Sequence, residues 1–132
     1  MELNKYIDHT NLKPYTTKEN IEKLCNEAVE YGFASVCVNP YYVKLASELL
    51  KDTNIAICTV IGFPLGQNTI DVKEFEAINA VQNGADEIDM VINIGALKDK
   101  KYDYVKKEIE TIRDSIDGKI LKIIIEKCYL TE

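Results

Sequence analysis

The strongest constraint on the fold of this chain is a segment with an acidic residue in the middle of an apolar run. Residues 84–93, GADEIDMVIN, follow a helical pattern and are typical of a β-strand. Because successive strand side chains point to opposite faces, Ile88 and Met90 share one face and Asp89 lies on the other. Burying a carboxylate without a partner costs several kcal/mol. We therefore expect Asp89 to have a fixed partner or to face a wet cavity.

The expected partner of Asp89 is Lys122. It lies in residues 121–126, LKIIIE, the other strand pattern with a charge in its interior, and it is the only lysine that we expect inside the core. An acid and an amine on adjacent strands suggest a site that handles protons. The same pair is also typical of a buried ion pair that only orders the core. The spacing leaves both interpretations open.

Strand and helix patterns alternate along the chain. We expect strands at 34–38, 54–61, 84–93 and 121–126, whereas residues 6–14, with Asp8, His9 and Thr10, are expected to make local turns. The helix at 69–83 is expected to bury Val72, Phe75, Ile78 and Val81, and a later helix is expected to bury Val105, Ile109, Ile112 and Ile116. This order predicts an α/β fold with a parallel sheet and right-handed crossovers.

Two architectures fit that order, a small doubly wound sheet and a part of a (β/α)8 barrel. A complete barrel usually takes about 250 residues, whereas this chain has 132. Length alone therefore favours the doubly wound sheet.

The charge and hydrophobicity of the chain argue against two classes of partner, nucleic acids and membranes. The chain has 22 acidic and 16 basic residues, a formal net charge of -6, and no basic run, so nucleic acid is not an expected partner. No apolar run approaches the roughly 20 residues of a membrane span, and residues 1–5 do not resemble a signal peptide.

The spacing of the cysteines indicates the redox state of the cellular compartment. None of them forms a Cys-x-x-Cys pair, which indicates free thiols in a reducing cytoplasm, and the inward-facing thiol of Cys37 is expected to pack as a small hydrophobe. With one histidine and no ligand spacing, the sequence predicts no metal site. The four cysteines are Cys25, Cys37, Cys58 and Cys128.

Five motifs change the balance between the two architectures. They are IDHTNLKP at 7–14, SVCVNP at 35–40, VIGFPLG at 60–66, EIDMVIN at 87–93 and LKIIIE at 121–126. In this order they closely resemble the deoxyribose-phosphate aldolases, and the resemblance covers the chain from Tyr6 to its last residues. It implies a TIM barrel of which residues 1–132 form one domain, a half-barrel of about four parallel strands in the order 1-2-3-4 with helices outside.

The resemblance also implies the chemistry. The family performs class I aldol cleavage, through a lysine Schiff base and without a metal or other cofactor, in deoxyribonucleotide catabolism. It interconverts 2-deoxy-D-ribose 5-phosphate with D-glyceraldehyde 3-phosphate and acetaldehyde. By resemblance, Asp89 matches the acidic proton donor and acceptor, and Lys122 matches the lysine beside the reacting centre. Asp8 and Cys37 match positions that line or support the site.

The sequence departs from the family in one important way. The family's Schiff-base lysine lies in a Lys-Thr-Ser segment on strand six, and a second lysine and the phosphate-binding loops follow it; this sequence contains none of these. We therefore expect little or no activity from the chain alone, and we expect a homo-oligomer. The alternatives are a catalytically dead, self-associating half-barrel and a doubly wound ligand-binding domain.

Overall fold

Five parallel strands lie in sequential order, β1-β2-β3-β4-β5, in the computed structural model, which describes residues 2–130. The strands are β1 (Asp8–Asn11), β2 (Ser35–Val38), β3 (Ala56–Ile61), β4 (Glu87–Val91) and β5 (Ile120–Ile124). The four expected strands are β2 to β5, and their predicted sequential pairing is confirmed. A doubly wound sheet would have placed a later strand outside the first, so that architecture is wrong for this chain.

The expectation for residues 6–14 needs correction, and with it the number of strands, which is five and not four. β1 pairs with β2 through Asp8↔Ser35 and the three residues that follow. Its sequence, DHTN, shows no apolar alternation because it is an edge strand whose side chains are only partly buried. The expected local bonding is also present, since Thr10 Oγ1 donates to the backbone oxygen of Asp8 at 2.7 Å.

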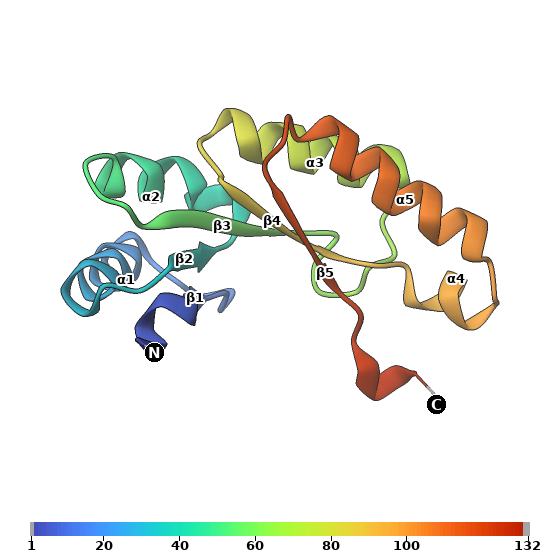
Figure 1. The fold of residues 1–132 in the computed structure, drawn as a ribbon, viewed down its shortest axis with the longest axis horizontal. Coiled ribbons are helices and arrows are strands. Elements are labelled where there is room, and N and C mark those ends of the chain that lie inside the picture. The colour runs from blue at the N-terminus through green and yellow to red at the C-terminus, as the bar shows by residue number, and fades with distance from the viewer. Residues whose placement is uncertain (1, 131–132) are drawn as a thin grey trace.

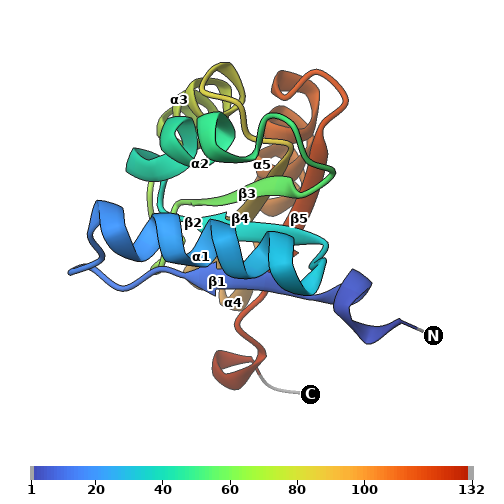
Figure 2. The ribbon, with the colours of Figure 1, turned by 90° about the vertical axis from the view of Figure 1, so that its left-hand side faces the viewer.

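The longer helices cover the convex side of the curved sheet, and the short helix α4 lies beyond the end of β4 (Figures 1 and 2). The α-helices are α1 (Lys18–Tyr31), α2 (Val43–Leu50), α3 (Ile70–Gln82), α4 (Ile94–Lys98) and α5 (Tyr102–Ser115), with 3-10 turns at Leu3–Tyr6, Pro40–Tyr42 and Lys127–Tyr129. Helix α1 begins after Thr17, whose hydroxyl accepts a hydrogen bond from the Asn20 backbone, and it ends at Gly32, where φ is 62°. None of the helices among residues 2–130 is long and apolar enough to cross a membrane.

The two faces of the sheet have different side chains. The main core lies between the sheet and the helices and includes Ile21, Val36, Ile61, Ile88, Met90 and Ile112. A smaller apolar cluster of Cys37, Cys58 and Val60, with Leu12 against it, lies on the opposite, concave face. Cys37, Asp89 and Lys122 all belong to the concave face, as the alternation of their strands predicts.

The buried face of helix α3 differs in part from the one expected: Val81 packs against the core as expected, but the other three residues do not. Val72, Phe75 and Ile78 are 47%, 70% and 36% exposed, whereas Lys73, Ala77 and Ala80 are buried. The small alanines allow close packing, and the buried lysine finds an acidic partner on α5. The expected buried face of α5 is confirmed, with Val105, Ile112 and Ile116 inside the core and Ile109 packed against it.

Candidate functional site

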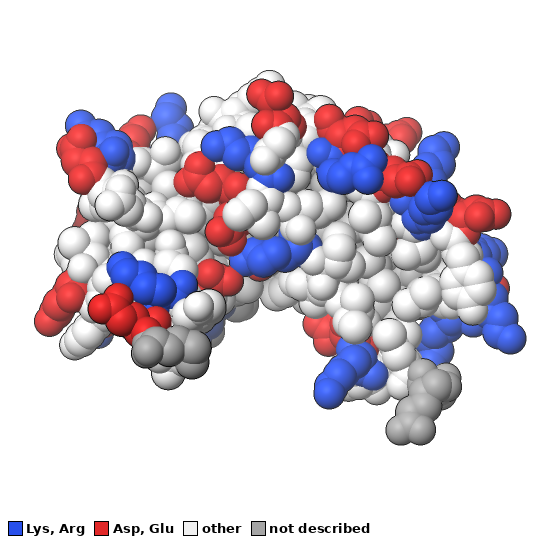
Figure 3. Space-filling model, viewed as in Figure 1, with Lys and Arg blue, Asp and Glu red and all other residues white. Residues whose placement is uncertain are grey.

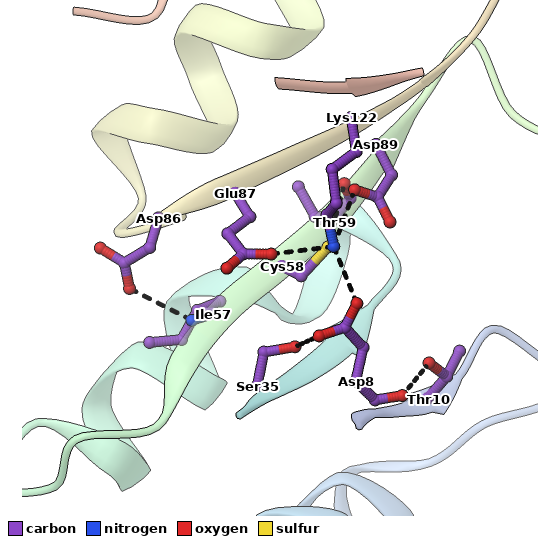
Figure 4. Close-up of polar contacts among 10 residues, drawn as sticks. All are labelled: Asp8, Thr10, Ser35, Ile57, Cys58, Thr59, Asp86, Glu87, Asp89 and Lys122. Atoms are coloured by element: carbon purple, nitrogen blue, oxygen red, sulfur yellow. Dashed lines mark hydrogen bonds and ion pairs between the residues drawn. The ribbon is translucent and has the colours of Figure 1, made fainter. Parts of the chain in front are cut away.

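One cation and three carboxylates meet in the hollow of the sheet. Lys122 Nζ lies 2.8 Å from Asp8 Oδ2, 2.8 Å from Glu87 Oε2 and 3.2 Å from Asp89 Oδ1 (Figure 4). Lys122 and Asp89 are direct neighbours across the β4–β5 ladder. Asp8 comes from the opposite edge of the sheet, so the curvature of the five strands brings β1 and β5 to the same point. Figure 3 shows the molecule hollowed at its lower side in that view.

The predicted contact between Asp89 and Lys122 is confirmed as a direct ion pair. It is not aligned as a hydrogen bond, however, so Asp89 Oδ1 is buried without a hydrogen-bond partner among the described residues. Two further acids contact Lys122, and Glu87 in particular was not expected as a partner. Its position two residues before Asp89, on the same face of β4, was the signal available in the sequence.

The electrostatics of the cluster keep Lys122 charged. Partial burial lowers its pKa, but the hydrogen bond to Asp8, the contact with Glu87 and the charge of Asp89 together outweigh burial and raise it. For Asp8, burial raises the pKa, and hydrogen bonds from Lys122 and from Ser35 Oγ, at 2.7 Å, outweigh it, so the pKa is lowered. Lys122 is therefore a fixed cation rather than a free amine.

The two inward cysteines lie next to the acids. Cys37 and Cys58 are register partners on β2 and β3, and their sulfur atoms and an Asp89 carboxylate oxygen all lie within 4.8 Å of one another. Both thiols are buried. The pKa of Cys58 is raised, chiefly by its hydrogen bond with Cys37 and then by burial. The spacing of these residues along the chain gave no sign of this grouping, because three separate strands supply them.

A second charged group supports the site from the helical side. Lys73 and Glu108 are both fully buried, and Lys73 Nζ contacts Glu108 Oε1 at 2.5 Å, the Gly66 oxygen at 2.9 Å and the Val91 oxygen at 2.8 Å. Glu108 Oε2 accepts a hydrogen bond from the Asn93 backbone at 3.0 Å. The pair therefore ties the loop after β3 to the end of β4, which carries Asp89.

This pair corrects the expectation that Lys122 is the only lysine inside the core, because Lys73 is 0% exposed and the Lys122 side chain is 35% exposed. The sequence did contain a signal. Lys73 precedes Ala77 by four residues, and Glu108 follows Val105 by three, so both charges fall on buried helical stripes.

The loop between β3 and α3 is shaped around Lys73. A Cβ atom at Gly62 would lie 2.5 Å from Lys73 Cε, and one at Gly66 would lie 2.0 Å from the Ile92 oxygen. Both glycines also have positive φ, 57° and 69°. The VIGFPLG motif is thus explained by packing against a buried lysine and the end of β4.

Comparison with known proteins agrees with this fold. The profile of the DeoC/LacD family aldolases matches residues 3–132. The chain belongs to this family of aldolases.

Curated relatives with the name deoxyribose-phosphate aldolase match nearly all of this chain. The protein from Thermoanaerobacter sp. (strain X514) is 60% identical over 134 residues, 99% of this chain and 60% of the relative. The protein from Clostridium tetani (strain Massachusetts / E88) is 60% identical over 133 residues, 100% of this chain and 62% of the relative. The chain thus spans about 60% of the length of these relatives.

Solved structures give the same architecture. QR15, an aldolase, has a TM-score of 0.93 and 44% identity, and the match covers 97% of this chain and 57% of that one. A tetrameric deoxyribose phosphate aldolase from Aeropyrum pernix has a TM-score of 0.85 and 32% identity, covering 98% and 54%. The five-stranded sheet with outer helices is therefore a partial (β/α)8 barrel.

Proposed function

We propose that this chain supplies the Asp89–Lys122 part of a class I aldolase site that cleaves 2-deoxy-D-ribose 5-phosphate to D-glyceraldehyde 3-phosphate and acetaldehyde. The observation that carries the proposal is the ion cluster in the hollow, where Lys122 contacts three acids from two strands. The name of the curated relatives, deoxyribose-phosphate aldolase, supports this choice of substrate. We further propose a cytoplasmic location, in keeping with four free cysteines.

The proposed roles follow from the charges. Asp89 has an oxygen without a hydrogen-bond partner among the described residues, so it is available to accept and return a proton at the substrate. Lys122 has a raised pKa and stays protonated, which makes it a fixed cation beside the reacting centre and not the Schiff-base nucleophile. Asp8 orients Lys122, and Cys37 lines the hollow beside Asp89.

The 132 residues alone are expected to have little or no activity. Class I chemistry needs an unprotonated amine, and no Lys-Thr-Ser segment of the family type is present in the sequence. Borohydride reduction with acetaldehyde should therefore leave no stoichiometric adduct on Lys122. A stoichiometric adduct there, mapped by mass spectrometry together with measurable cleavage, would contradict the assignment.

A chimera tests the positive part of the proposal. The chain is joined to the portion of the Clostridium tetani relative that lies beyond the matched region, and aldehyde release from deoxyribose 5-phosphate is measured. Asp89→Asn and Lys122→Met should each reduce kcat by at least about 100-fold. This is the lower range for loss of acid–base catalysis at Asp89 and for loss of electrostatic stabilisation at Lys122. Asp117→Asn, at an exposed turn, is the matched control and should retain activity.

The outcomes separate the alternatives. A folded chimera that does not cleave the substrate would favour a catalytically dead, self-associating half-barrel. A chimera in which Asp89→Asn remains fully active would remove Asp89 from the mechanism while leaving family membership intact.

A further inference from the structure

Two thiols and one carboxylate from three neighbouring strands converge in the hollow, and we propose that they bind a thiophilic divalent cation of the zinc class. The ligand atoms are Cys37 Sγ on β2, Cys58 Sγ on β3 and a carboxylate oxygen of Asp89 on β4, all within 4.8 Å of one another. Zn²⁺ prefers thiolate and carboxylate ligands of this kind. No other described group of three histidine, cysteine, aspartate or glutamate side chains meets the same distance limit.

The geometry needs little adjustment. Ligands about 2.3 Å from a tetrahedral ion lie about 3.8 Å apart, so a spread of at most 4.8 Å closes with side-chain shifts of about 1 Å or less. The backbone is already fixed, since Cys37 opposes Cys58 and Val60 opposes Asp89 in the parallel ladders. Three protein ligands leave a fourth position open, as in zinc sites that bind a water or a small molecule.

The charge around the site favours a cation. Asp8, Glu87 and Asp89 contribute three carboxylates and Lys122 contributes one ammonium group, so the cluster holds more negative than positive charge. Lys122 opposes a nearby cation, but it can keep its two shorter contacts, 2.8 Å to Asp8 and 2.8 Å to Glu87, while Asp89 turns to the metal. The buried Asp89 Oδ1 has no hydrogen-bond partner among residues 2–130, and its lone pair is therefore available to coordinate the ion.

Binding must release protons. The two thiols and the carboxylate combine with one M²⁺ to give a bis-thiolate carboxylate complex and two H⁺, which balances the charge on both sides. Affinity should therefore rise with pH, because a thiol has to lose its proton to bind the metal. Asp8, Glu87 and Lys122 are the other charged side chains that face the same hollow.

Cadmium titration of the 132-residue chain tests the site without substrate. We expect one Cd²⁺ per chain, an ultraviolet thiolate-to-cadmium charge-transfer band, displacement by Zn²⁺, no competition by Mg²⁺, and about two protons released per ion in weak buffer. Cys58→Ala and Cys37→Ala should each weaken binding by at least about 10-fold and reduce the band. Asp89→Asn should weaken binding and keep the band.

Two thiols outside the cluster provide matched controls. Cys25 is buried on α1 and Cys128 is exposed near the last described residues, so Cys25→Ala and Cys128→Ala should bind Cd²⁺ as the unchanged chain does. Circular dichroism establishes whether each variant is folded. If a variant does not fold, the number of protons that the unchanged chain releases per Cd²⁺ still tests whether two thiols bind the ion.

The proposal is overturned if the unchanged chain shows no saturable band, if Cys128→Ala abolishes it, or if folded Cys37→Ala and Cys58→Ala both bind normally. Because binding is measured without catalysis, inactivity of the chimera would not affect this result.

Discussion

Lys122 is shared among three acids, and this sharing sets the relative cost of replacing each member. Removing Asp89 leaves the lysine with Asp8 and Glu87, both at 2.8 Å. Removing Lys122 leaves three carboxylates facing one another. At the scale of single residues, the cation is therefore the member whose loss should be felt most.

We expect Lys122→Met to lower the free energy of unfolding by about 1–3 kcal/mol, between the ranges for exposed and buried ion pairs, because the Lys122 side chain is 35% exposed. Asp89→Asn should cost less, since it keeps the shape of the side chain. Urea unfolding of the three proteins measures the difference. Equal stability of Lys122→Met and the unchanged chain would mean that the cluster is solvated and contributes nothing.

Asp8 predicts how the stability changes in acid. Its pKa is lowered in the folded chain, so its contacts stabilise the fold above the ordinary carboxyl value of 3.8 and are lost as the pH falls through the lowered value. The unchanged chain should melt at a higher temperature than Asp8→Asn at pH 7, and the gap should shrink below about pH 4. A gap that stays constant from pH 7 to pH 3 would contradict this. Because Asp8 is 40% exposed, added salt should also narrow the gap.

At the scale of elements, the Lys73–Glu108 pair joins α3 and α5 to the ends of β3 and β4. Each partner is fully buried, so each depends on the other for its charge balance. Replacing one partner alone should therefore lower the free energy of unfolding more than replacing both together.

Lys73→Met should cost about 3–5 kcal/mol, because it leaves Glu108 buried without its cation. The double variant Lys73→Met/Glu108→Leu should recover part of that loss, since no buried charge remains. Denaturant unfolding of the single and double variants tests the difference. Recovery would be absent if the backbone hydrogen bonds to Gly66, Val91 and Asn93 matter more than the charge.

Strand periodicity was enough to predict which side chains enter the hollow. Alternation placed Cys37, Asp89 and Lys122 on the inward face, and the order of the strands followed from the motifs. β1 escaped prediction because an edge strand need not be apolar, and DHTN has no hydrophobic alternation. The buried face of α3 was wrong because hydrophobicity favoured Phe75, whereas the close approach of α3 selected Ala77 and Ala80 and an ion pair accommodated Lys73.

The grouping of side chains within the hollow could be predicted only in part. The Asp89–Lys122 contact followed from two adjacent strands with one charge each. The approach of Asp8 depends on the curvature of the whole sheet, and the Cys37–Cys58–Asp89 group depends on the register of three strands. Neither the curvature of the sheet nor the register of the strands can be predicted from the spacing of residues along the chain.

At the scale of the whole molecule, β1 and β5 each have one neighbour in the described sheet, so each presents an unpaired edge. A closed barrel has no such edges. Open edges and exposed apolar groups favour association with another chain. The tetrameric Aeropyrum pernix relative is compatible with association in this family.

We therefore predict that the 132-residue chain associates with itself in solution. Light scattering coupled to size exclusion should give a mass of at least twice 15.0 kDa at high concentration. Phe75→Ser, on the exposed face of α3, is the control, and it should leave the mass unchanged if the strand edges drive association. A stable mass near 15.0 kDa for the unchanged chain would contradict the prediction.

The contact between Lys122 and Asp8 joins residues 114 positions apart. Such a contact closes a very long loop of chain, so it is expected to form late in folding, after the local helices and the neighbouring strand pairs. During synthesis, the ion cluster has to wait until β5 has emerged and docked. An amine-reactive label that distinguishes paired from free Lys122 would therefore report when the sheet is complete. Protection of Lys122 from the label should appear later in folding than the burial of α1 or α2.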